Sequence, residues 1–146
     1  MKFMKSALVI AALTLSALSQ SISISEPAAG TRVCAGCTIN VEVDKDNSQA
    51  PSKEVGIVIA MRTCNNGGCV DPLTTSNLGK VLYNGPYNPH YGEGPTHNNG
   101  LHQDFPVEVP TSFITGKAEL SVFHLSLVGD SQILTFEIKS VMVDVA

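Results

Sequence analysis

The sequence has no tryptophan, no Asn-x-Ser/Thr glycosylation signal and few charged residues, which make up 15% of the chain. It also has no Gly-x-Ser-x-Gly turn of the kind that presents a hydrolase nucleophile, and no glycine-rich phosphate loop. The carboxylates are scattered, so the sequence pairs no two of them as a catalytic acid and base. We therefore expect a protein that binds a partner, with no catalytic residue and no cofactor.

The N-terminus, residues 1–19, has the pattern of a secretory signal peptide. Lys2 and Lys5 precede the uncharged apolar run Ala7–Leu18, and a small residue, Ser19, suits the cleavage position. This run of about a dozen residues is shorter than the ~20 residues that a membrane-spanning helix needs. We expect the segment to be removed, which leaves a secreted, extracellular chain.

The predicted mature chain, residues 20–146, is long enough for one hydrophobic core and is expected to form a single domain. Its formal charge is −6, because loss of Lys2 and Lys5 removes two positive charges from the −4 of the whole chain. An acidic chain without a basic patch argues against nucleic acid and anionic membranes as partners. The C-terminus lacks a hydrophobic tail behind a polar spacer, so we expect neither a lipid anchor nor stable membrane insertion.

Four cysteines lie in the predicted exported part: Cys34, Cys37, Cys64 and Cys69. An even number outside the cell predicts two disulfides. We favour the local pairs Cys34–Cys37 and Cys64–Cys69, since a turn-forming Asn-Asn-Gly-Gly insert separates the second pair; crossed pairs stay open, because neighbouring strands could join the two groups. Zinc binding and a redox role for Cys-Ala-Gly-Cys are the competing interpretations. An oxidising compartment disfavours the first, and the lack of a βαβ pattern disfavours the second.

Short β-branched or alternating runs recur between Gly, Pro, Asn and Asp, and no segment keeps a helical period. Seven strands are predicted: Ser21–Ser25, Thr38–Asp44, Glu54–Arg62, Gly79–Asn84, Phe105–Val109, Ala118–Val128 and Phe136–Val145. We expect the third to be central, Pro106 to lie at a sheet edge, and a register change or bulge between Ile138 and Val141. Their spacing of about ten residues predicts an all-β, immunoglobulin-like sandwich of antiparallel strands, stabilised by disulfides. It is not a true antibody domain, because the buried tryptophan and the inter-sheet cysteine pair are missing.

A polar, Gly/Pro/Asn-rich stretch of about twenty residues, Tyr83–Asp104, is too long for an ordinary strand connection, and such a loop is usually functional or disordered. We expect Tyr87–Leu101 to be the most mobile part of the domain. The whole stretch contributes six candidate recognition residues: Tyr83, Tyr87, His90, Tyr91, His97 and His102. The tyrosines recur at four-residue intervals among asparagines, an arrangement that suits stacking against sugar rings. The competing interpretation, which we favour, is that they anchor the loop on the sandwich.

Two arrangements of histidine could carry chemistry. A metal site in the loop would take its ligands from His90, His97, His102, Tyr91, Glu93 and Asp104. Their spacing matches no motif and the loop offers no rigid frame, so we predict no metal. His124 shares a predicted strand face with Leu120 and Val122, and we expect a packed, hydrogen-bonded histidine with no catalytic role.

Several short motifs run through most of the mature chain: Glu26–Gly36 leading into Thr38–Val43, Glu54–Met61, Leu78–Pro86, Val109–Phe113, Gly116–Ala118 and His124–Gly129. In these motifs the chain resembles the necrosis-inducing secreted protein family of fungi. The resemblance implies a secreted effector that binds a host protein, a receptor-associated immune kinase among the expected partners, and that suppresses plant immune signalling or induces necrosis. It carries over no catalytic residue.

The Pro-x-x-Gly opening, Pro27–Gly30, followed by an alternating strand is similar to the extracellular module of fungal cell-wall glucan-assembly proteins. This weaker resemblance implies a cell-wall or glycan-binding module without catalytic activity. We therefore expect a secreted fungal effector-like protein first, and a glycan-binding module as the alternative.

Overall fold

The computed structural model describes residues 21–47, 50–64, 68–69, 71–72, 76–92 and 100–146, and the predicted signal peptide lies outside them. Nine strands form in the described residues: β1 Ile22–Glu26, β2 Thr31–Val33, β3 Thr38–Lys45, β4 Ser52–Thr63, β5 Lys80–Gly85, β6 His90–Tyr91, β7 Leu101–Glu108, β8 Gly116–Val128 and β9 Ile133–Val145. All seven predicted strands are confirmed, and the short β2 and β6 are additional. Within these ranges, no helix has the length and hydrophobicity to cross a membrane.

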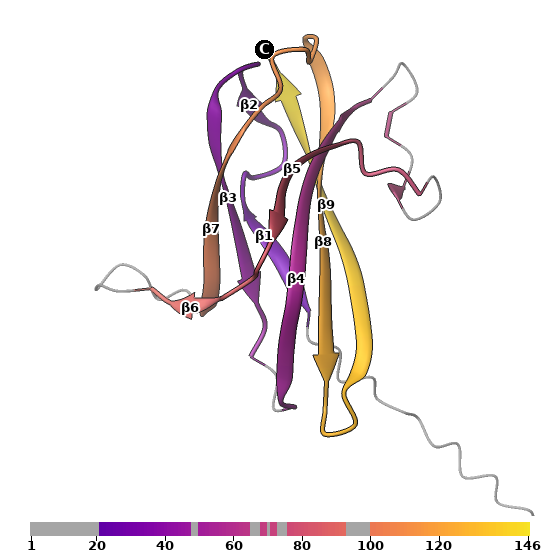
Figure 1. The fold of residues 1–146 in the computed structure, drawn as a ribbon. Helices are drawn as coiled ribbons and strands as arrows, with labels where there is room; N and C mark the ends of the chain where they lie inside the picture. Colours follow the sequence, from indigo (N-terminus) through magenta and orange to yellow (C-terminus); the bar gives the residue numbers. More distant parts are fainter. Residues whose placement is uncertain (1–20, 48–49, 65–67, 70, 73–75, 93–99) are drawn as a thin grey trace, which may run out of the picture.

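The strands form two sheets that pack face to face, with the long strands β4, β8 and β9 side by side (Figure 1). One sheet has the order β1-β3-β7-β6 and the other the order β2-β9-β8-β4-β5. The all-β, immunoglobulin-like sandwich is thus confirmed, and β4 is an interior strand as expected. Pro106 lies at an edge, because β6 pairs only with the first two residues of β7. Contrary to the purely antiparallel expectation, β2 pairs with β9 in parallel.

The core lies between the sheets and follows from the alternation of apolar residues along each strand. Its main cluster consists of Ile22, Val41, Val43, Ile57, Ile59, Tyr87, Phe105, Val107, Leu120 and Val122. A second cluster closes one end with Val33, Met61, Val109, Ala118, Val143 and Val145. Each large apolar side chain buried here stabilises the fold by about 1.5–3 kcal/mol relative to an exposed position.

The expected bulge in the last strand is wrong. The β8–β9 pairing runs from Gly116–Val145 to Val128–Ile133 without a register shift. The alternation simply continues through Glu137 and Lys139, so charged residues occupy inward positions where the sequence pattern suggested apolar ones. The irregularity lies instead in β4, between Glu54 and Gly56.

Both disulfides are the local ones. Cys34 and Cys37 have Cα atoms 5.3 Å apart, and those of Cys64 and Cys69 are 4.8 Å apart. No cysteine is free. The first pair closes a turn that two backbone hydrogen bonds fasten to Val109, one donated by Gly36 N and one accepted by Cys37 O. All four sulfur atoms are therefore bonded in disulfides, as predicted.

Candidate functional site

Two of the candidate recognition tyrosines pack against the core. Tyr87 is 1% exposed; its ring meets the edge of His124 with centroids 5.4 Å apart, and its hydroxyl donates to Val43 O at 3.1 Å. Tyr83 is half-buried, packs on Phe105 with ring centroids 4.7 Å apart, and donates to Pro86 O at 2.8 Å. The prediction that these side chains form an exposed recognition platform is wrong for Tyr87. The anchoring interpretation is confirmed for both, because Tyr87 belongs to the main core cluster and Tyr83 packs against that cluster.

The histidines of the same stretch divide between surface and interior. His90 and Tyr91 are exposed and form β6, which pairs with the start of β7. His102, directly opposite His90 with ring centroids 5.7 Å apart, is only 5% exposed, which contradicts its assignment as an exposed contact residue. His97 and Glu93 lie outside the described residues. Among the described residues, no three His, Cys, Asp or Glu side chains are grouped closely enough to hold a metal ion.

His124 lies in the core between two carboxylates that the sequence did not pair. It is 1% exposed, and its Nε2 is hydrogen-bonded to Glu54 of β4, while its Nδ1 lies 3.5 Å from Glu137 Oε1 of β9. Lys45 of β3 forms an ion pair with Glu54, and Ile22 N donates to Glu137 Oε1 at 2.7 Å. The expected packed, hydrogen-bonded histidine is confirmed. The cluster joins five strands across the sandwich: β1, β3, β4, β8 and β9.

Burial opposes charge on all three central groups, but their mutual contacts prevail. Burial favours neutral His124, yet its hydrogen bonds to Glu137 and Glu54 raise its pKa to about 9. Burial would also raise the pKa of Glu54 and of Glu137, but the hydrogen bonds from His124 hold both below the usual value. The imidazolium and the carboxylates are therefore charged together at neutral pH. The ring of His124 is enclosed, and the cluster connects neighbouring strands inside the sandwich.

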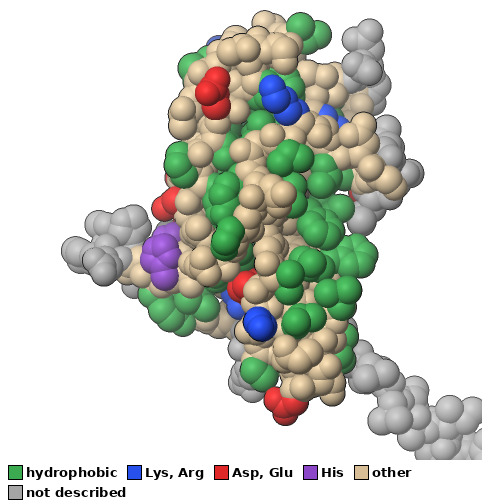
Figure 2. Space-filling view, viewed as in Figure 1, with side chains coloured by type: hydrophobic (Ala, Val, Ile, Leu, Met, Phe, Trp, Pro, Cys, Tyr) green, Lys and Arg blue, Asp and Glu red, His purple; other side chains and the backbone are tan. Residues whose placement is uncertain are grey.

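The outer face of the five-stranded sheet carries an apolar surface that was not among the predicted site residues. We define this outer apolar face by Val55, Val58, Phe123, Leu125, Leu127, Leu134, Phe136 and Ile138. Leu134 is 63% and Phe136 58% exposed, and Phe136 stacks on Phe123 with ring centroids 5.9 Å apart. Figure 2 shows apolar side chains gathered along the side of the molecule that β8 and β9 form. A signal for it existed in the second half of β8, where Phe123, Leu125 and Leu127 place apolar residues at every outward position, as in a strand that is covered on both sides.

Beyond the outer apolar face, the same sheet face carries two ion pairs at one end, and Lys53, opposite Leu127, is exposed at the other end. Arg62 Nη2 lies 2.6 Å from Glu119 Oε2, and Lys117 Nζ lies 2.9 Å from Asp144 Oδ1. The change from paired charges to uncharged apolar side chains therefore occurs along the strands. It gives the outer apolar face a defined polar border at one end.

The outer face of the four-stranded sheet is acidic. Glu26, Glu42 and Asp104 lie directly opposite one another on three adjacent strands. Burial, and then repulsion from Asp44 and Asp104, raises the pKa of Glu42. Like charges in opposite positions destabilise a sheet. The negative charge of the domain is thus concentrated on the face opposite to the apolar one.

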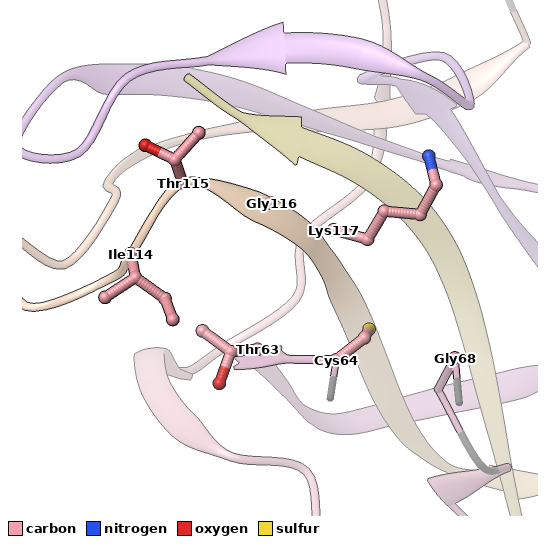
Figure 3. Close-up of a pocket in the computed structure, with 7 residues that line it drawn as sticks. All are labelled: Thr63, Cys64, Gly68, Ile114, Thr115, Gly116 and Lys117. Atoms are coloured by element: carbon pink, nitrogen blue, oxygen red, sulfur yellow. The ribbon is translucent and has the colours of Figure 1, made fainter. Parts of the chain in front are cut away.

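Of the hollows that adjoin the five-stranded sheet, two lie near the surfaces described above. One of about 420 Å³ lies at the outer apolar face, where β5 leaves the sheet, and its lining includes Val55, Pro86 and Phe123. The other, of about 360 Å³, lies beside the second disulfide and is lined by Thr63, Cys64, Gly68, Ile114, Thr115, Gly116 and Lys117 (Figure 3). Neither lining contains a histidine or a carboxylate. The lysine in the second lining extends toward β9, where its ion-pair partner lies.

The fold and these surfaces define a small disulfide-bonded β-sandwich of the immunoglobulin-like class, whose most prominent surface feature is an apolar sheet face. The model of the Nis1 family matches residues 19–144, so the chain belongs to the Nis1 family. This membership supports the resemblance to effector-like, necrosis-inducing fungal proteins, while the weaker resemblance to glucan-assembly modules stays a prediction.

Among solved structures, the chain is similar to fibronectin(III)-like modules of Clostridium thermocellum CbhA, with 10% identity and a TM-score of 0.43. The match covers 86% of this chain and 96% of that one. No curated protein matches the chain.

Proposed function

We propose that the mature chain is a secreted effector-like protein that acts by binding a host protein, without catalysis, and that the outer apolar face is its binding site. The observation that carries this proposal is the exposure of large apolar side chains from neighbouring strands on one sheet face. Soluble monomers rarely leave contiguous apolar patches larger than a few hundred Å² uncovered unless the patch binds something. Membership of the Nis1 family supports the effector-like part.

The face has the composition of an interface centre. Its stacked pair, Phe123 and Phe136, offers large aromatic area on a rigid strand pair, so little conformational entropy is lost on binding. It contains no carboxylate, and the paired charges of Arg62 and Glu119 lie at its border. An apolar centre with a polar rim is typical of protein–protein interfaces.

The expected partner is a host protein, with a receptor-associated immune kinase as the class that the family resemblance implies. The glycan-binding alternative loses its main support, because Tyr83 and Tyr87 pack against the core and cannot form a stacking platform. Of the three tyrosines, only Tyr91 remains exposed.

The test is capture of host proteins from plant extracts by the immobilised mature domain and by two matched variants. Phe136→Asp places a charge in the outer apolar face, and Ile114→Asp makes the same kind of change at an exposed apolar residue elsewhere. Loss of an aromatic anchor typically costs on the order of 2 kcal/mol or more, about thirtyfold in affinity. We expect Phe136→Asp to lose the captured protein and Ile114→Asp to retain it. Equal capture by both variants would refute the site.

A further inference from the structure

We propose that the host partner binds by strand addition: it supplies an extended segment, with alternating apolar side chains and basic flanking residues, that pairs with the open edge of β9. The inference rests on the proposed function for the existence of the partner. It goes further in naming the backbone of β9 as the element that the partner recognises, and an extended strand as the form in which the partner binds.

The edge is open over much of β9. On one side, β9 pairs with β8 along its whole length, but on the other side β2 pairs only with Val143–Val145. From Ile133 to Val141, no described strand forms a backbone ladder with this second side, and β1 lies beside it only at Lys139–Val141, across a hollow. A row of unpaired N–H and C=O groups of this kind is a template for pairing with another chain.

The direction of the backbone groups follows from the bonds at the far end of the strand. Met142 O accepts from Gly30 N at 2.8 Å, and Ala146 N donates to Val33 O at 2.8 Å, so even-numbered residues of β9 face the β2 side. Because backbone groups alternate in direction along a strand, those of Leu134, Phe136 and Ile138 point to the open edge. The side chains of these three residues belong to the outer apolar face. One added strand would therefore pair with their backbone and cover their side chains together.

The other sheet edges are shorter or interrupted, as edges protected against association usually are. β2 has three residues and β6 has two. β1 carries a register shift after Ile24, and β5 runs into Pro86. In β9 the charged side chains of Glu137 and Lys139 lie on the inward face, so they do not block pairing along the edge to Ile138, and Ile133–Phe136 has no charge, proline or bulge. Because the edge of this segment is exposed and has none of these protective features, we expect the partner strand to pair here first.

Charge and geometry favour a foreign strand over a second copy of this chain. Two mature domains of formal charge −6 repel each other, whereas a partner with basic flanks is attracted. Pairing of β9 with a second β9 would also join two outer apolar faces into one larger uncovered surface. A foreign partner whose paired strand leads into a further apolar surface would instead cover the outer apolar face.

The probe is a synthetic peptide of alternating valine and threonine with lysines at both ends, N-methylated along one edge so that it cannot form fibres. Its affinity is measured for the mature domain and for Leu134→Pro and Leu134→Ala. Both variants lose the leucine side chain, but only Leu134→Pro loses the N–H that points to the edge, and proline is tolerated at sheet edges. We expect Leu134→Pro to bind about fivefold more weakly than Leu134→Ala, the factor that one net backbone hydrogen bond supplies. A peptide methylated along both edges should not bind.

Amide hydrogen exchange of the wild-type domain gives a second readout that no folding defect can obscure. Saturation with the probe should slow exchange at Leu134, Phe136 and Ile138, with no change at Tyr91 in β6. Absence of binding at millimolar probe, equal affinities of the two Leu134 variants, or protection at Tyr91 alone would overturn strand addition. Dimers that form through β9 without the probe would show that a second copy is the occupant.

The two proposals fail in different ways. If Phe136→Asp releases the captured host protein while Leu134→Pro and Leu134→Ala hold it equally, the face binds and only strand addition is wrong. If Phe136→Asp retains the host protein, the proposed site itself is wrong.

Discussion

Raising the pH from 6 to 9 should destabilise the mature domain by about 3 kcal/mol. The reason is that His124 binds its proton more tightly in the folded protein than in the unfolded chain. In the fold, the pKa of His124 is about 9, against an ordinary value of 6.5. Below pH 6.5 both folded and unfolded states carry the proton, and the full stabilisation is present. Between 6.5 and 9 the unfolded chain loses the proton while the fold keeps it, so stability falls across this window.

The magnitude follows from the difference of about 2.5 between the pKa of His124 in the fold and its ordinary value, because a difference of 1 in pKa corresponds to about 1.36 kcal/mol. The groups facing His124 come from three strands: Glu54 of β4, Glu137 of β9 and, through Glu54, Lys45 of β3. Tyr87 packs on the ring, and its pKa is raised by burial first and then by Glu54. Measurements that stop at pH 9 avoid ionisation of tyrosine in the unfolded chain.

The assay is urea unfolding followed by circular dichroism at pH 6, 7.5 and 9. His124→Gln should lower stability at pH 6 and flatten the profile, while His90→Gln, which changes an exposed histidine, should leave the slope of the wild type intact. A wild-type profile without a slope between pH 6.5 and 9, or a slope that survives in His124→Gln, would refute the assignment of charge to this cluster.

Further predictions concern the anchor, the disulfides and catalysis. Tyr87→Ala should cost about 3–5 kcal/mol in urea unfolding and Tyr87→Phe about 1 kcal/mol, the hydrogen bond to Val43 O; a loss below 1 kcal/mol for Tyr87→Ala would contradict its role in the core. The folded protein should show no free thiol by mass after alkylation, and partial proteolysis should recover Cys34–Cys37 and Cys64–Cys69 as linked pairs; crossed pairs would contradict the structure. Pure protein should not turn over polysaccharide, ester or peptide substrates, and turnover abolished by one substitution would overturn the non-enzymatic proposal.

The strands were predictable from the sequence because alternation, β-branched residues and turn residues act locally. Glu54–Arg62 and Ala118–Val128, for example, became interior strands near their predicted bounds. β2 was missed because three residues between a Gly turn and a Cys turn show no period, and its parallel pairing with β9 depends on chain packing. The local disulfides were predictable for the same reason as the turns that they close.

The site was less predictable, because it depends on which residues meet across strands. Glu54, His124 and Glu137 lie far apart in sequence, and only the β4–β8–β9 register brings them together. The Gly, Pro and Asn neighbours of Tyr87 are typical of an exposed loop, yet its ring is buried in the core between the sheets. The outer apolar face was hidden because an alternating pattern does not say which face of a sheet stays uncovered.

Hydroxyl-radical footprinting of the mature domain, alone and saturated with the captured host protein, tests the central claim most directly, because it measures which side chains become covered. Binding through the outer apolar face predicts reduced labelling of Phe123, Leu134 and Phe136, with unchanged labelling of Ile114 and Tyr91. Protection of Tyr91 with undiminished labelling of Phe136 would contradict the account and return the binding site to the loop around β6.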